Sequence, residues 1–247
     1  MPDTPALSVF IAAMMTALAT GLGALPFLFI KSLSPKLMGL ANAAAAGLML
    51  AACHGLVAEG IALSPERTLF GVLIGLAGIV LGHRLVTRGS VPEIAQLRGL
   101  DARRALLIVG VMTAHSFAEG VAVGVSFAGE GALASFISTA IAVHNIPEGL
   151  AIALVLVPRG TPVWQAAAWA VFSSLPQPLM AVPAYLFVES FAPFLPVGFG
   201  LAAGAMFWLV FAELVPEATE NEKHERVAIA VTLSFAAMLA FQYLVLK

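Results

Sequence analysis

Two short segments, HSFAEG at 115–120 and HNIPEG at 144–149, each place a histidine and a glutamate four residues apart inside a run of mostly apolar residues. A run of this kind is typical of a membrane-spanning helix. An ionisable side chain near the centre of a bilayer costs several kcal/mol, so it normally faces a partner, an ion or a water-filled cavity. Two such pairs in neighbouring runs therefore indicate one shared polar site.

The composition of the chain indicates an all-α integral membrane protein. Of its 247 residues, 60% are apolar and 11% are charged, which lies far from the balance of a soluble domain. Runs of about 20 apolar residues are long enough to cross the hydrocarbon core as helices. We expect a single transmembrane domain over 1–247 with eight spans, at about 7–30, 37–60, 68–86, 103–128, 131–156, 162–188, 192–216 and 226–246.

The lysines and arginines predict how the spans are oriented, because cytoplasmic connections carry an excess of them. With both termini outside, ten of the 12 basic residues fall on the inner side. Only Arg67 and Lys247 fall outside. The first span lacks a basic leader and is expected to stay as a helix, and the length and compactness of the chain favour a bacterial plasma membrane. The ten inner residues are Lys31, Lys36, Arg84, Arg88, Arg98, Arg103, Arg104, Arg159, Lys223 and Arg226.

Other features of the chain exclude some partners and sites. The single cysteine, Cys53, rules out an internal disulfide. No basic patch with interleaved aromatic residues indicates nucleic acid, and nothing indicates a prosthetic group. The connection at about 87–102 has no histidine or cysteine cluster and is expected to be a linker. The sequence leaves the oligomeric state open, with a homodimer as one option.

Spans four and five are expected to build the polar site. Only Gly129, Glu130 and Gly131 connect these spans, so the two helices should lie antiparallel and adjacent. Residues four apart share one face of a helix. His115 with Glu119, and His144 with Glu148, therefore each present an imidazole and a carboxylate in one direction, flanked by Ser116 and Asn145.

The chemistry of these side chains favours a transition metal. Imidazole nitrogen and carboxylate oxygen together suit Zn²⁺, Fe²⁺ and Mn²⁺, whereas Ca²⁺ and Mg²⁺ sites use oxygen alone. The two carboxylates of Glu119 and Glu148 neutralise one divalent cation. Pro147 lacks an N–H, so the carbonyl of Val143 is expected to lose its usual partner.

The sixth span carries a polar, proline-interrupted stretch, SSLPQP at 173–178. Pro176 is expected to free the carbonyl of Phe172, as Pro147 does one span earlier. Broken helices at the midplane are a common way for transporters to build binding sites. Gln177 in this stretch is a candidate ligand through its amide oxygen, with a hydrogen bond between helices as the alternative.

These motifs and the eight-span layout resemble the ZIP (Zrt/Irt-like) family of divalent metal transporters over nearly the whole chain. The resemblance implies uptake of Zn²⁺ and related ions, including iron, manganese and cadmium, toward the cytoplasm. It implies that His115, Glu119, His144 and Glu148 are metal ligands, with Ser116 and Asn145 at or beside a second metal position. It also implies that spans one to three and six to eight form inverted repeats around the central pair.

Two positions depart from the family pattern. Ala118 stands where many relatives have a proline, so the fourth span is expected to be less broken. Gln177 stands where metal-bridging relatives have a glutamate, and its neutral side chain favours a single metal over a binuclear centre. The family often has an acidic residue at the position of Glu213, which makes this residue a candidate transit ligand near the inner end of span seven.

His54 and Glu59, near the outer end of span two, are candidate sites of transient metal binding during entry, and Glu217 is a candidate for such binding during exit.

Two other functions stay open at this stage. An intramembrane zinc hydrolase would use the metal to activate water, but ligands at mid-depth on neighbouring helices favour passage of the ion. A metal sensor would need a signalling domain or a long tail, for which the sequence gives no indication.

Overall fold

The computed structural model describes residues 5–30, 34–88, 99–128 and 131–245, and within them the chain is helical. Lys31, Arg98, Lys247, the Gly129–Glu130 connection and most of the expected linker at 87–102 lie outside these ranges. The helices are α1 (Pro5–Leu22), α2 (Pro26–Phe29), α3 (Pro35–Leu63), α4 (Pro65–Arg88), α5 (Gly99–Ser126), α6 (Gly131–Leu156), η1 (Val157–Arg159), α7 (Val163–Ser174), α8 (Pro176–Leu186), α9 (Val188–Phe191), η2 (Ala192–Phe194), α10 (Leu195–Leu209), the π-helical turn η3 (Val210–Leu214), α11 (Val215–Asn221) and α12 (His224–Val245).

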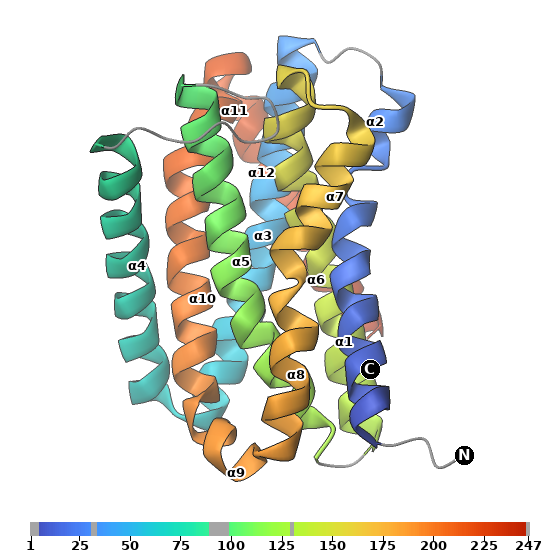
Figure 1. Ribbon diagram of the computed structural model, residues 1–247. Helices are drawn as coiled ribbons and strands as arrows, with labels where there is room; N and C mark the ends of the chain where they lie inside the picture. The colour runs from blue at the N-terminus through green and yellow to red at the C-terminus, as the bar shows by residue number, and fades with distance from the viewer. Residues whose placement is uncertain (1–4, 31–33, 89–98, 129–130, 246–247) are drawn as a thin grey trace.

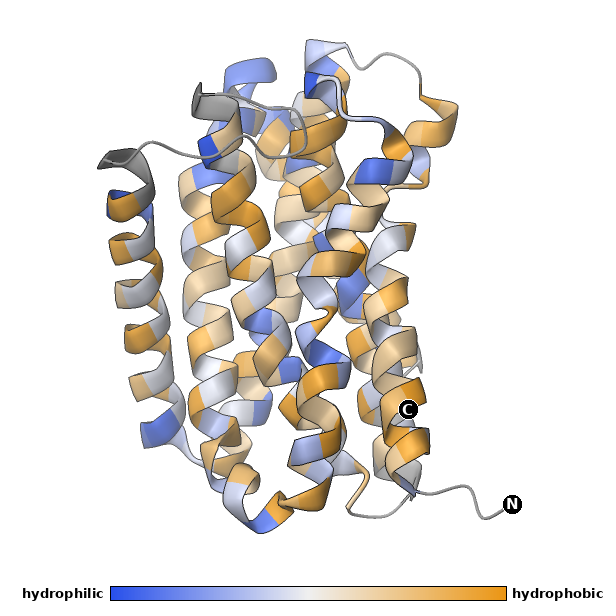
Figure 2. Cartoon of the chain, viewed as in Figure 1, coloured by the Kyte–Doolittle hydropathy of each residue, from blue (hydrophilic) through white to orange (hydrophobic). Residues whose placement is uncertain are grey.

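The long helices run roughly parallel and antiparallel in one bundle (Figure 1). Figure 2 shows hydrophobic colours along most of their length, with hydrophilic residues at the ends and at a level partway along α5 and α8. Large apolar side chains such as Leu69 and Leu73 of α4 and Leu233 of α12 are exposed on the outside. This distribution is typical of an integral membrane protein, whose outer surface contacts lipid.

Seven helical segments within the described residues are long and apolar enough to cross a membrane. They correspond to seven of the eight predicted spans. The remaining one, the sixth span predicted at 162–188, is divided into α7 and α8. These helices have 12 and 11 residues, and each is too short to cross the membrane alone. The chain reverses direction at each span, so α1 begins and α12 ends toward the lower end of the view in Figure 1.

The helices pack in a pattern that agrees with the inverted repeat. α1 packs against α6 as α8 packs against α5, and α3 packs against α12 as α10 packs against α4. The contacts of α3 with α6 and of α10 with α5 form a further matching pair. Exchanging spans one, two, three and four for six, seven, eight and five therefore converts each of these contacts into its matching one.

Two glycines allow the central helices to approach their neighbours closely. A Cβ on Gly149 of α6 would lie 1.7 Å from the carbonyl oxygen of Thr20 in α1, and one on Gly120 of α5 would lie 2.5 Å from that of Gln177 in α8. Both separations are shorter than a carbon–oxygen contact allows. Each glycine ends its sequence motif, so each motif brings a partner helix against the polar residues that precede it.

Candidate metal centre

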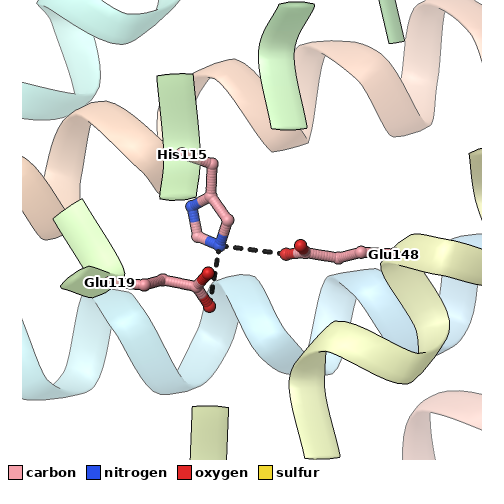
Figure 3. A group of neighbouring side chains, drawn as sticks. All are labelled: His115, Glu119 and Glu148. Atoms are coloured by element: carbon pink, nitrogen blue, oxygen red, sulfur yellow. Dashed lines mark ion pairs between the residues drawn. The ribbon is translucent and has the colours of Figure 1, made fainter. Parts of the chain in front are cut away.

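Three side chains from the two motifs meet in the middle of the bundle. Nε2 of His115 lies 3.3 Å from Oε1 of Glu119, on the same helix α5, and 2.9 Å from Oε1 of Glu148 on α6. Figure 3 shows the imidazole between the two carboxylates. One ligand atom from each of the three residues lies within 4.8 Å of the others, a spacing that a single coordinated cation can bridge.

The three side chains are almost completely enclosed, each with about 1% of its surface exposed. Among the described residues, Nδ1 of His115 and Oε2 of Glu148 have no hydrogen-bond partner, and Oε1 of Glu119 and Oε1 of Glu148 have none besides their contact with Nε2 of His115. Buried polar atoms are nearly always hydrogen-bonded or bound to an ion. The cluster therefore has the donor atoms, the negative charge and the unused bonding capacity that a divalent transition metal requires.

Gln177 orients one of the carboxylates. Its Nε2 donates a hydrogen bond of 2.6 Å to Oε2 of Glu119, which directs Oε1 of the same carboxylate toward His115. Its Oε1 accepts hydrogen bonds from Thr16 Oγ1 at 2.6 Å and Asn145 Nδ2 at 3.1 Å. The amide oxygen, the atom that we expected to be a ligand, therefore accepts two hydrogen bonds from other helices in this structure, and its role as a ligand stays a prediction.

Ser116 and Asn145 are both buried next to the cluster in sequence. Asn145 Nδ2 also donates to the backbone carbonyl of Thr16 at 2.7 Å, which ties α6 to α1. Among the described residues, Oδ1 of Asn145 and Oγ of Ser116 have no hydrogen-bond partner. Each residue keeps one oxygen that is available to a ligand.

The proline of the sixth span interrupts the helix at the level of Gln177. Leu175 forms a turn between α7 and α8, because Pro176 has no N–H to continue the helix. The prediction that the Phe172 carbonyl is left free is wrong, since it accepts a hydrogen bond of 3.2 Å from the N–H of Leu175.

The two central helices are not interrupted. The helix α5, which has Ala118 in place of a proline, is continuous as expected, and α6 is continuous through Pro147.

His144 lies outside the three-residue cluster. Its Nε2 is in hydrogen-bonding contact with the side-chain amide of Gln242 on α12. With 9% of its surface exposed, it lines a cavity of about 470 Å³ that Glu119 also lines. His144 and Glu148 are four residues apart on α6, yet His144 meets Gln242 and Glu148 meets His115, so the neighbouring helices decide which partner each side chain meets.

The cavity reaches the cluster from one end of the bundle. Its walls come from the C-terminal parts of α3, α5 and α12 and the N-terminal parts of α6 and α10. Because α3 and α12 end, and α6 and α10 begin, at the lower end in Figure 1, the cavity lies toward that end. His54 and Glu59 both line it, and their role on the path of an entering ion stays a prediction.

Glu213 and Glu217 lie on the chain that follows α10. Glu213 is on the π-helical turn η3, apart from the three-residue cluster. Such turns often occur at functional sites. Glu217 is buried in α11, where its Oε1 lies 3.2 Å from Nη2 of Arg159 at the end of η1. This ion pair joins the end of the α6 segment to α11, at the end of the bundle opposite the cavity.

A sequence comparison identifies the family. The family model described as ZIP zinc transporter matches residues 90–242, which include both motifs and the sixth span. The chain belongs to the ZIP family.

Similar proteins include a candidate zinc transporter of Arabidopsis thaliana, 45% identical over 92% of this chain. The zinc transporter ZIPB of Bordetella bronchiseptica is 34% identical over 90% of the chain, and the zinc transporter GufA of Myxococcus xanthus is 33% identical over 84%. The aligned part spans 37% of the plant protein but 76% and 87% of the two bacterial ones. All three names describe transporters and none an enzyme, so the hydrolase alternative has no support.

Three polar residues in and around this ZIP site were missed in the sequence. Thr16 of α1 donates to Gln177, and its neighbour one turn on, Thr20, is hydrogen-bonded to Ser174 at 2.7 Å. Gln242 contacts His144. A threonine pair four residues apart in the first span, and an amide inside the last, are the signals that could have identified them, since polar side chains in spans tend to face other helices.

Proposed function

We propose that this protein carries Zn²⁺, and with it related divalent ions such as iron, manganese and cadmium, across a membrane toward the cytoplasm. The observation that supports this proposal best is the enclosed cluster of His115, Glu119 and Glu148, whose ligand atoms lie within 4.8 Å of one another. Two carboxylates neutralise one divalent cation, and the mixed nitrogen and oxygen donors suit zinc. The metal is the transported substrate.

The other predicted residues take supporting roles in this proposal. His144 joins the ligand set when an ion arrives, because it lines the same cavity as Glu119. Gln177 fixes the Glu119 carboxylate, and the free oxygens of Ser116 and Asn145 provide a weaker second position. Glu213, on the turn η3, is a transit ligand on the way out.

We further propose that transport occurs by alternating access in a single transmembrane domain. The cavity gives the cluster a route to one end of the bundle, while the Arg159–Glu217 pair lies at the other. The positive-inside rule favours the cavity end as the outer side, since the exposed Arg67 lies at that end and Arg159, Lys223 and Arg226 at the opposite one. Both termini would then be outside, in a bacterial plasma membrane.

Flux into proteoliposomes tests the function. We expect saturable Zn²⁺ flux from the native chain, reduced at least about tenfold in Glu119→Gln and in Glu148→Gln, because each change removes a charged ligand. Glu66→Gln is the matched control, since Glu66 is exposed in the first turn of α4. Absence of native flux would refute transport, and flux that survives both substitutions would refute the site.

Labelling of cysteines tests the orientation. Cys53 is buried, and Cys53→Ala gives a background without cysteine. In this background we expect a membrane-impermeant maleimide to label Arg67→Cys in intact cells but Lys223→Cys only after permeabilisation. The reverse pattern would mean that the cavity opens to the cytoplasm.

A further inference from the structure

Gln242 connects the last span, α12, to the candidate metal centre. It lies near the end of α12, a helix whose packing is mainly with α3. Its neighbours Phe241, Tyr243 and Leu244 are exposed, whereas Gln242 is partly buried and lines the cavity with His144. Its side-chain amide meets Nε2 of His144 across 98 positions of sequence.

This contact occupies a nitrogen that a metal would use. Nε2 of an imidazole has one bonding direction, which holds either a hydrogen bond or a coordinated metal. Nε2 of His144 is directed to Gln242, while Nε2 of His115 is directed to the two carboxylates. Coordination of an ion through Nε2 of His144 therefore requires that the contact with Gln242 be broken.

The cavity places this exchange on the path of an incoming ion. Glu119 and His144 both line it, and a Cβ added to Gly55 would lie only 3.8 Å from Cε1 of His144. The small residue at position 55 leaves room beside the imidazole ring. An ion that arrives from the cavity can thus reach Glu119 and His144 before it reaches His115 and Glu148 behind them.

We propose that Gln242 is a positioning residue that holds the imidazole of His144 on the cavity wall until an ion replaces the contact. This inference rests on the proposed metal transport. Gln242 lowers the affinity of the outward-facing site, because each binding event breaks a hydrogen bond. In return, the contact keeps the His144 ring away from the carboxylates of the empty site, so the path from the cavity to Glu119 remains open.

The substitution Gln242→Leu tests this role, because leucine is similar in volume but forms no hydrogen bond. A net hydrogen bond corresponds to about a 2- to 10-fold change in an equilibrium constant. We expect the Kd for Zn²⁺ in detergent and the KM for flux to fall by about this factor, with no increase in kcat. Disturbed packing alone would weaken binding or lower kcat, so a tighter site is a result that a structural role does not produce.

Gln165→Leu is the matched control. Gln165 lies on α7 beside Trp169 and Phe172, and this variant should keep the native Kd and KM. Gln242→Ala, which also lacks the hydrogen bond, is the second variant and should tighten binding like Gln242→Leu. If the native chain transports Zn²⁺ but the folded Gln242 variants have an unchanged or higher Kd, the inference about Gln242 is overturned. Absence of flux in the native chain would instead refute the proposed function.

Discussion

Nε2 of Gln177 donates a hydrogen bond of 2.6 Å to Oε2 of Glu119, so a residue of the interrupted sixth span fixes one of the two carboxylates of the candidate metal centre. The amide is neutral and its oxygen is used by Thr16 and Asn145. The centre thus has two negative charges, which is enough for one divalent ion. A second ion would have to be held by neutral oxygens.

The charge at position 177 is predicted to set how many ions bind. We expect the native chain to bind about one Zn²⁺ ion with high affinity, and Gln177→Glu to allow a second, because a third carboxylate offsets the repulsion between two cations. Elemental analysis of metal per protein after equilibrium dialysis measures this ratio. Gln165→Glu adds the same charge on α7 and should leave it unchanged. Two tightly bound ions in the native chain would contradict the prediction.

Zinc affinity is predicted to fall as the pH is lowered. The imidazole and carboxylates must be free of protons to coordinate, so protons compete with the metal and are released when it binds. For each proton that the metal displaces, the Kd should rise about tenfold per unit of decreasing pH over the range in which the metal-free site holds that proton. Calorimetry at about pH 7 and pH 5.5, in buffers of different ionisation enthalpy, measures both effects. Glu148→Gln should show a smaller pH dependence, and an affinity independent of pH would contradict proton competition.

The close approach of α6 to α1 is predicted to make Gly149 intolerant of a side chain. In Gly149→Ala the new Cβ would lie 1.7 Å from the Thr20 carbonyl oxygen, so the helices must separate, at a cost of about 1–3 kcal/mol. We expect a lower melting temperature in detergent and weaker zinc binding. Gly110→Ala is the control, since a Cβ there has no neighbour within 4 Å. Equal melting curves for the two variants would show that the approach is not tight.

The Arg159–Glu217 pair is predicted to favour the arrangement in which the cavity is open. Glu217→Gln removes its charge attraction, which for a partly buried pair is worth about 1 kcal/mol or more. We expect a maleimide to label Ala140→Cys, on the cavity wall, at least about threefold more slowly in this variant within the Cys53→Ala background. Glu220→Gln, at an exposed position on the same helix, should leave the rate unchanged. Faster labelling in Glu217→Gln would mean that the pair opposes the open arrangement.

The sequence predicted the helical membrane architecture because each span carries its own signal. A run of about 20 apolar residues has no alternative to a helix in lipid, and seven predicted spans correspond to long helices within the described residues. The division of the sixth span between α7 and α8 also has a local cause, the missing N–H of Pro176. The pairing of His115 with Glu119 follows from helix geometry, which puts residues four apart on one face.

The sequence alone therefore determined the spans, the two motifs and the residue types of the candidate metal centre, since these depend on hydrophobicity and on spacing along one helix. Tertiary structure decided the partners. It brings Glu148 to His115, directs His144 to Gln242, and places the Gln177 amide between Glu119 and Thr16. These contacts join helices far apart in sequence, and they depend on how each helix is rotated about its axis. That rotation is fixed by packing at residues such as Gly120 and Gly149, where the neighbouring backbones meet.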